Sequence, residues 1–348
     1  MDFERLLCDG RLVAIITRQE LMPATGEGGV IFPPTYQDEN SAEPTYNISD
    51  FGNGRNVCTI DSVASQINRL EKRFATESPY RDLVPHVIVK ARISDKKVGI
   101  EHERYIDVLE APHRLADATI RFAKEMHQKA KEAFLEFQKG NADPIARLSP
   151  MSLLFGAWDS HITGVKIPRA FMARIEAQNV HLRVRRGYYI AKLPAAEINL
   201  ETGKAKTLST IGLDNAGAKG LDGVVADGSI FREAIGNLIA LRDNCRSRNE
   251  AEGTAIRRYI LGLLLVAQTM PVVGFLRQGC ILVTKGRPES YLRLSDGTTE
   301  LFSLTHEEAL SYAKDQAAAF GVDTSEKFYE FSPELAKDAL RKRTEEPK

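Results

Sequence analysis

Seven Lys and Arg side chains and only one acid fall between residues 161 and 192, although the whole chain balances 47 basic against 47 acidic side chains. Apolar and basic residues alternate from Val180 to Arg186. Because strand side chains alternate between two faces, His181, Arg183 and Arg185 are predicted to share one face. Guanidinium groups fit phosphate oxygens, and rows of positive charge attract polyanions. This stretch is a candidate polyanion contact, although a solvated outer sheet face has the same pattern.

Other side chains are candidates for the same contact. Lys166 and Arg169 precede the alternating stretch, and Arg18 directly follows the first predicted strand. Asn68 and Arg69 lie on a predicted helix, where they could reach a ligand or simply form a charged helix surface.

No catalytic motif is present that would identify an enzyme. Asp159, Ser160 and His161 are adjacent in sequence, but a catalytic triad depends on spatial geometry. Asp61, Asp159 and Asp214 supply carboxylates for a metal-dependent nuclease, although their spacing does not select them. The residues therefore favour a binding protein, and a nuclease that uses Asp159, His161 and Asp61 is the alternative.

Composition limits the remaining possibilities. With 43% hydrophobic residues the chain can bury a core, and its zero net charge argues against indiscriminate coating of nucleic acid. Four scattered cysteines predict reduced thiols in a cytoplasmic protein, with neither a metal site nor a cofactor. The N-terminus lacks the layout of a signal peptide. The apolar run Tyr259–Phe275 predicts a buried helix leading into a turn and strand, not a membrane span.

Hydrophobic periodicity predicts an α+β fold. The predicted strands are Leu12–Thr17, Val84–Ala91, Tyr105–Leu109, Val180–Arg186 with Gly187–Leu193 as its hairpin partner, Val272–Phe275 and Gly279–Thr284. The predicted helices are Thr59–Phe74, His113–Gln138, Arg169–Ala177, Ile230–Leu241, Thr254–Met270, His306–Phe320 and Pro333–Arg343. Two long excursions, 22–56 and 194–228, are rich in Gly and polar residues and exceed ordinary connections.

Three segments, in order, resemble a known family. They are Asp61–Glu71 (DSVASQINRLE), Ser149–Trp158 (SPMSLLFGAW), and Lys166–Ala170 (KIPRA) followed by Ile175–Val180 (IEAQNV). The resemblance is to the backbone subunit of CRISPR type I-G (formerly I-U) effector complexes, a Cas-seven-type RAMP protein, and it covers roughly Leu12–Tyr189.

The resemblance implies a modified RRM-like (ferredoxin-like) palm interrupted by a finger and a thumb. On this view residues 1–348 form one discontinuous domain. The palm comprises about 1–21, 57–193 and 229–348, the finger insertion is 22–56, and the thumb insertion is 194–228.

The resemblance also implies a non-enzymatic subunit that binds guide RNA, stacks head to tail with other copies, and presents the guide to target DNA. Its partners would be the guide, the target DNA, further copies and other subunits of the complex, without a membrane. In the stretch 180–186, Arg and His occupy positions where an ordinary RRM has aromatic residues that stack on bases. This favours contacts to the RNA phosphate backbone over recognition of individual bases. The implied RNA contacts are Lys166, Arg169, Arg183, Arg185, Arg186, Asn68, Arg69, Arg18 and His181. The implied thumb residues are Lys204, Lys206, Leu208, Ile211 and Lys219.

Overall fold

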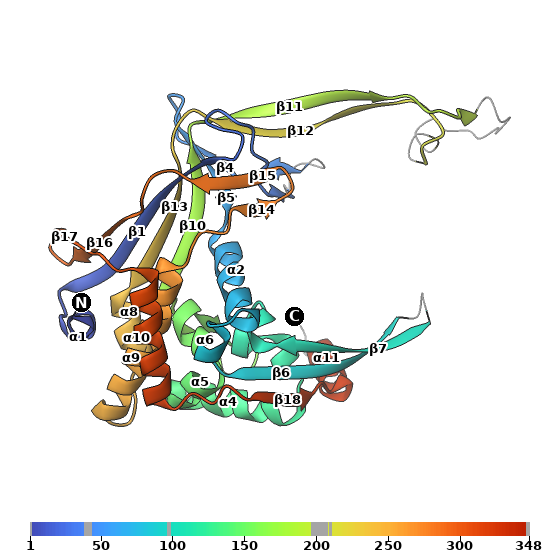
Figure 1. The fold of residues 1–348 in the computed structure, drawn as a ribbon. Coiled ribbons are helices and arrows are strands. Elements are labelled where there is room, and N and C mark those ends of the chain that lie inside the picture. The colour runs from blue at the N-terminus through green and yellow to red at the C-terminus, as the bar shows by residue number, and fades with distance from the viewer. Residues whose placement is uncertain (1, 38–43, 96–98, 196–207, 209–210, 346–348) are drawn as a thin grey trace.

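The computed structural model describes the chain except residues 1, 38–43, 96–98, 196–207, 209–210 and 346–348. The elements form a mixed α+β fold, which confirms the predicted class. A large antiparallel sheet stands on one side, and a three-stranded sheet with helices lies at the lower end (Figure 1). A long two-stranded hairpin projects from the upper end of the large sheet (Figure 1).

The large sheet has the strand order β14-β15-β1-β13-β10-β5-β4, with β16 beside β1 and β17 beside β16. Its members are β1 (Leu12–Pro23), β4 (Ile48–Asp50), β5 (Asn56–Asp61), β10 (Phe171–Gln178), β13 (Ile230–Asn237), β14 (Phe275–Arg277), β15 (Cys280–Thr284), β16 (Glu289–Leu294) and β17 (Thr299–Leu301). The first predicted strand and the predicted strand Gly279–Thr284 are confirmed, while β16 and β17 were not foreseen.

Two central strands overturn predicted helices. The prediction of a helix over Arg169–Ala177 is wrong, because β10 alternates between buried and more exposed residues along its length. The prediction of a helix over Ile230–Leu241 is also wrong, since β13 runs to Asn237 before α8 (Leu238–Asn244) begins. Asn237 caps this helix, its Oδ1 accepting from the Ala240 amide at 3.0 Å.

Helices cover one face of the large sheet and form the main core. They are α2 (Val63–Thr76), α8, α9 (Glu250–Thr269) and α10 (His306–Phe320). The Ser62 hydroxyl accepts from the Ser65 amide to begin α2, whose residues Ile67, Leu70 and Phe74 face the core. α9 is buried on nearly all sides, and α10 has the bounds predicted from its periodicity. Within the described part of the chain, no helix has the length and apolarity needed to cross a bilayer.

The lower end is built on a smaller sheet, β18-β6-β7. Its strands are β6 (His86–Asp95), β7 (Ile100–Asp107) and β18 (Glu326–Glu330), and its helices are α3 (Ala118–Arg121), α4 (Lys124–Gln138), α5 (Asp143–Leu148), α6 (Pro150–Phe155) and α11 (Pro333–Glu345). The predicted helix His113–Gln138 is therefore broken into shorter pieces. The strand predicted over Tyr105–Leu109 ends at Asp107 and gives way to a 3-10 turn.

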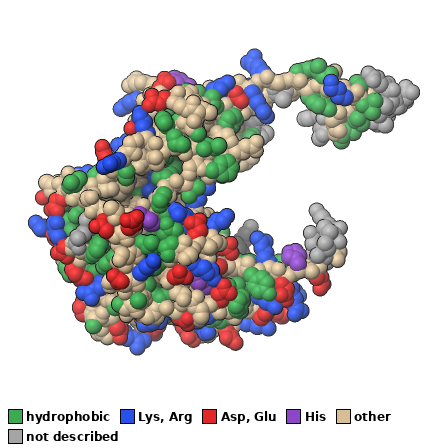
Figure 2. All heavy atoms as spheres, viewed as in Figure 1, with side chains coloured by type: hydrophobic (Ala, Val, Ile, Leu, Met, Phe, Trp, Pro, Cys, Tyr) green, Lys and Arg blue, Asp and Glu red, His purple; other side chains and the backbone are tan. Residues whose placement is uncertain are grey.

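The hairpin, here called the arm, consists of β11 (Val180–Tyr189) and β12 (Ala216–Ala226). β11 continues through Gly187, which pairs with Ala218, so the predicted hairpin turn at Gly187 is wrong. The basic stretch Val180–Arg186, which the resemblance assigned to the palm, lies on the arm and not on the large sheet. Figure 2 shows a wide opening between the arm and the lower end of the molecule.

The excursion 22–56 contains the short strands β2 (Thr35–Tyr36) and β3 (Thr45–Tyr46), together with β4. Part of it packs against the root of the arm. The backbones of Ile31 and Val224 form an isolated antiparallel β-bridge, and the Tyr46 hydroxyl accepts a hydrogen bond from the Gly223 amide at 3.1 Å. Gly223 has φ +87°, and a Cβ there would meet the Ile31 carbonyl oxygen at 2.7 Å. A glycine is thus required where this segment clamps the arm.

Candidate nucleic-acid interface

A groove of about 400 Å³ lies where the N-terminal half of α2 meets the chain after α6. We call it the Trp158 groove. Its walls are Ala64, Asn68, Pro112, His113, Arg114, Phe155, Gly156, Ala157, Trp158, Lys166, Ile167, Pro168 and Arg169. In Figure 1, α2 lies between the arm and the lower end of the molecule.

A short hairpin presents the two most prominent side chains of the groove. Strand β8 (Ala157–Trp158) pairs with β9 (Lys166–Ile167), which places Trp158 opposite Lys166. The Lys166 Nζ lies 5.7 Å from the centre of the indole ring, within the range of a cation–π contact. Trp158 is nevertheless 61% exposed, which leaves the ring accessible to a ligand.

Asp159 holds the turn of this hairpin. Its Oδ2 accepts from the Thr163 amide at 3.0 Å and from the Thr163 hydroxyl at 2.7 Å. The Asp159 side chain is buried, so its carboxylate serves the turn and does not face the groove. The hairpin is therefore fixed locally by a capped loop.

Gly156 allows the second strand of the hairpin to approach closely. It has φ +82°, and a Cβ there would lie 2.9 Å from the Ile167 carbonyl oxygen and 3.0 Å from the Arg169 Cγ. A larger residue would displace β9 and with it Arg169.

Arg114 ties this glycine to α2. Its guanidinium donates to both Glu71 carboxylate oxygens at 2.6 and 2.9 Å and to the Gly156 carbonyl at 3.0 Å. Burial raises the pKa of Glu71, whereas the Arg114 charge and hydrogen bonds oppose that rise. Arg114 has φ 53°, a backbone conformation that a non-glycine residue keeps only when its surroundings hold it.

No acid is found among the described residues that line the groove. Lys166, Arg169 and His113 are all exposed there, and Asn68 adds an amide from α2. A flat aromatic ring flanked by cations suits a nucleotide, because the base stacks on the ring while the phosphates meet the cations. The groove thus has the chemistry of a single-strand contact.

Three of the predicted contacts, Asn68, Lys166 and Arg169, come together in this groove. Arg69, their predicted neighbour, does not. Its Nε donates to Asp61 Oδ2 at 3.0 Å and its Nη2 to the Leu276 carbonyl at 2.8 Å, so it joins α2 to the sheet. Arg18 is exposed on the sheet, its guanidinium carbon 4.0 Å from the centre of the Phe231 ring.

The remaining predicted contacts lie on the arm. Arg183 forms an ion pair with Asp222 at 3.2 Å, and His181 contacts Asp227 at 2.6 Å. Arg185 and Arg186 are exposed and have no ion pair with any described residue. Opposite Arg186 in the register lies Lys219, another exposed cation. The outer half of the arm therefore concentrates uncompensated positive charge.

The proposed thumb-tip residues are only partly described. Ile211 is 60% exposed, and Leu208 is half-buried with its carbonyl accepting from the Leu213 amide at 2.9 Å. Lys204 and Lys206 lie outside the described residues.

The two carboxylates of the nuclease alternative, Asp61 and Asp159, already have protein partners. Asp61 is fully buried and accepts from Gln66 at 2.7 Å and from Arg277 at 2.9 Å, in addition to Arg69. His161 is exposed on the turn that Asp159 holds. Across the described residues, no group of three His, Cys, Asp or Glu side chains is placed to hold a metal. The four cysteines form no disulfide.

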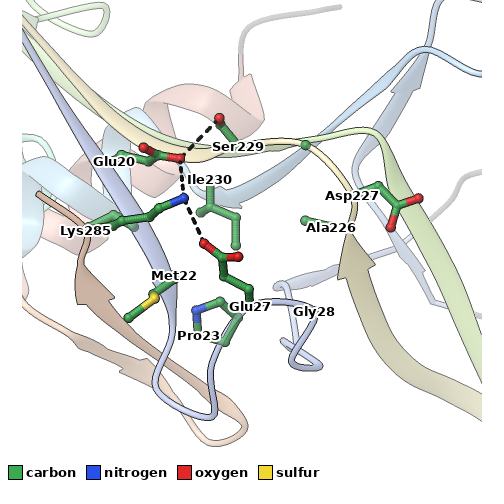
Figure 3. Close-up of a pocket in the computed structure, with 12 residues that line it drawn as sticks. Glu20, Met22, Pro23, Glu27, Gly28, Ala226, Asp227, Ser229, Ile230 and Lys285 are labelled. Carbon is green, nitrogen blue, oxygen red and sulfur yellow. Dashed lines mark hydrogen bonds and ion pairs between the residues drawn. The ribbon is translucent and has the colours of Figure 1, made fainter.

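A second hollow, of about 300 Å³, lies at the root of the arm and has a different character. Figure 3 shows Lys285 between two acids, with its Nζ 3.3 Å from Glu20 and 2.8 Å from Glu27. Asp227 also lines this hollow. Its acids outnumber its single cation, so it would repel a phosphate strand.

Sequence reasoning missed Trp158, His113 and Arg114. Trp158 is the only tryptophan of the chain, and it ends an apolar run in which nothing marks it as a ligand-facing ring. One signal for its exposure was available in the sequence. Trp158 directly precedes the turn that Asp159 begins, and side chains next to a turn are often exposed.

Comparison with known proteins supports one part of this interpretation. No curated protein matches the chain. The model of the family described as CRISPR-associated protein GSU0053 matches residues 15–182, a span that contains α2, the Trp158 groove and the first residues of β11. Over these residues the chain is similar to that CRISPR-associated family.

Proposed function

We propose that this protein is a non-enzymatic RNA-binding subunit of a type I CRISPR interference complex, of the type I-G backbone kind. It holds a guide RNA along the Trp158 groove and the arm, and presents it for pairing with target DNA. Further copies add head to tail, and other subunits complete the assembly.

One observation carries the proposal. Side chains from two separate segments, Asn68 of α2 and the pair Lys166 and Arg169, line the same groove as the exposed ring of Trp158, and no described acid lines it. Cations that contact the phosphates of a single strand, next to an aromatic ring on which a base can stack, bind the strand without regard to its sequence. A protein that binds guide RNAs of different sequences requires this property.

The arm supports the same function in a second way. It stands away from the core with Arg185, Arg186 and Lys219 exposed, across the opening seen in Figure 2. A strand lying in the opening would meet cations from both sides. A head-to-tail contact between such subunits is heterologous and builds an open helix.

The test is to purify the chain with a guide RNA and measure binding, cleavage and assembly on the same sample. We expect salt-dependent RNA binding, regular repeats in electron micrographs, and intact RNA after incubation with Mg²⁺ or Mn²⁺. Defined cleavage that is lost in Asp159→Ala would instead establish the nuclease alternative. Absence of RNA binding at low salt would refute both.

A further inference from the structure

Arg232 carries a buried charge in the middle of the large sheet. It lies on β13, is 4% exposed, and its Nε donates to the Gln66 Oε1 at 3.0 Å. No described residue accepts a hydrogen bond from its two terminal nitrogens, and none forms an ion pair with it. Burial lowers the pKa of Arg232 to about 10. A buried guanidinium without a counter-ion is costly, so its persistence calls for an explanation.

The surrounding polar cluster is short of negative charge. Gln66 donates to Asp61 Oδ2 at 2.7 Å, but that carboxylate already pairs with Arg69 and Arg277. Arg232 reaches it only through the neutral Gln66 amide. Three guanidinium groups thus share one carboxylate, and an anion supplied from outside would balance the excess.

A cavity of about 490 Å³ adjoins Arg232, and we call it the Arg232 pocket. Its polar lining is Thr17, Gln19, Arg232, Gln268, Thr269, Thr284, Ser290 and His306, and its apolar lining is Met270, Pro271, Val272, Pro288, Phe302 and Leu304. No acid occurs among the described lining residues. This volume and this mixture of an apolar wall with a few polar groups are typical of small-molecule sites.

Gln268 adds a second unpaired polar group. Its Nε2 donates to the Thr17 hydroxyl at 2.8 Å and to the Ala234 carbonyl at 3.1 Å, while its buried Oε1 has no partner. Buried polar atoms are rarely left unpaired. The pocket is therefore lined by a guanidinium whose terminal nitrogens have no partner among the described residues, and it lies next to a buried amide oxygen that also has none.

We propose that the Arg232 pocket binds a small molecule with a carboxylate or phosphate head on an apolar body. The head pairs with the Arg232 guanidinium, and the apolar body lies against Met270, Phe302 and Leu304. The apolar half of the pocket does not suit a sugar–phosphate strand, so this site is separate from the RNA contacts proposed above.

Calorimetric titration of the full chain with benzoate, phenyl phosphate and benzamide tests this. We expect benzoate or phenyl phosphate to bind saturably at millimolar concentration, and the uncharged benzamide to bind at least about tenfold more weakly. The anion that binds more tightly identifies the head group as a carboxylate or a phosphate. Arg232→Gln should weaken that anion at least about tenfold. Arg104→Gln removes the same charge from an exposed position on β7, outside the pocket, and should leave binding unchanged.

A second variant protects the test if Arg232→Gln fails to fold. Pro288 is exposed at the lining of the pocket, so Pro288→Trp should fill the space and abolish anion binding without removing the charge. Equal binding of benzoate and benzamide, no saturable binding, or retained affinity in Pro288→Trp would overturn the proposal. Displacement of benzoate by a 12-nucleotide RNA would also overturn it, because the pocket would then belong to the RNA path.

Discussion

The Arg114 guanidinium donates to the carbonyl oxygen of Gly156 at 3.0 Å, and this bond links the buried Arg114–Glu71 pair to the floor of the Trp158 groove. Arg114 is in turn held by Glu71 of α2. A buried ion pair therefore helps to position the groove from inside the protein.

Breaking this ion pair should destabilise the fold. Glu71→Gln leaves the Arg114 charge buried without a counter-ion, and we expect a loss of about 3 kcal/mol in the free energy of unfolding, measured by urea titration. The double variant Glu71→Leu/Arg114→Met should recover most of that loss, because buried pairs are often replaceable by apolar residues. Its RNA affinity should stay reduced, since Gly156 has lost its anchor. Full recovery of RNA affinity would contradict the positioning role of Arg114.

Gly156→Ala should lower both stability and RNA binding. The new Cβ would lie 2.9 Å from an Ile167 atom and 3.0 Å from an Arg169 atom. The alanine would also have to adopt a positive φ of +82°. Gly164→Ala is the matched control, because Gly164 has φ +72° but no atom within 4 Å of the place that a Cβ would take. Positive φ alone should cost each variant about 1 kcal/mol, and Gly156→Ala should lose more, because its ψ of 159° is nearly exclusive to glycine and its Cβ has no room. Equal urea midpoints for the two would show that the close approach does not matter.

The double variant Lys166→Gln/Arg169→Gln should bind RNA more weakly and less steeply with salt. Each phosphate contact to a single strand contributes about 0.7 to the slope of log affinity against log salt, so the slope should fall by about 1.4. Lys131→Gln/Lys314→Gln makes the same charge change on α4 and α10, outside the groove and the arm. Fluorescence anisotropy with a labelled RNA measures both. An equal fall in the control pair would mean that only net charge matters.

On the arm, Arg185→Gln should weaken RNA binding more than Arg183→Gln. Arg183 already pairs with Asp222, whereas Arg185 has no ion pair with any described residue and is free to meet a phosphate. We expect the salt slope to fall by about 0.7 for Arg185→Gln and by less for Arg183→Gln. If the two variants behave alike in the same anisotropy assay, the Asp222 pair does not restrain Arg183.

Shortening the arm should separate folding from assembly. Val184 and Leu221 are opposite each other, so residues 185–220 can be replaced by Asn-Gly, which closes a two-residue hairpin turn. The root of the arm, with Val224 buried against Ile31, is retained. Thermal unfolding should be nearly unchanged, while electron micrographs with guide RNA should lose regular repeats. Regular repeats in the shortened protein would remove the arm from any role in assembly.

The sequence predicts some elements well because local signals agree. The helix His306–Phe320 has a capping box in which Thr305 and Glu308 bond each other's backbone, and the periodicity continues to Gly321. β10 was mistaken because Phe171 and Ile175, like Ala173 and Ala177, are four residues apart, a spacing that fits one face of a helix as well as one face of a strand.

The candidate site was predictable only in part. Lys166, Arg169 and Asn68 stand out by residue type and family resemblance. The buried Arg114–Glu71 pair helps to bring them together, and it joins residues 43 positions apart and leaves no local pattern. The burial of Arg232 could not be predicted for a related reason. In the helix predicted over Ile230–Leu241, no pattern indicates that Arg232 faces the core. Contacts between distant segments decide both sites, and periodicity does not report them.

The arm is a two-stranded ribbon with no second layer packed on it along most of its length. Its strand β11 has ten residues and is about 30 Å long, and of these residues only Val180 is buried. Leu182, Val184 and Tyr188 remain in water until something covers them. Proteases cut most readily where backbone and apolar side chains are accessible. We expect an unassembled copy to be nicked first at the arm and then degraded, so that the number of surviving subunits follows the amount of RNA available to hold them.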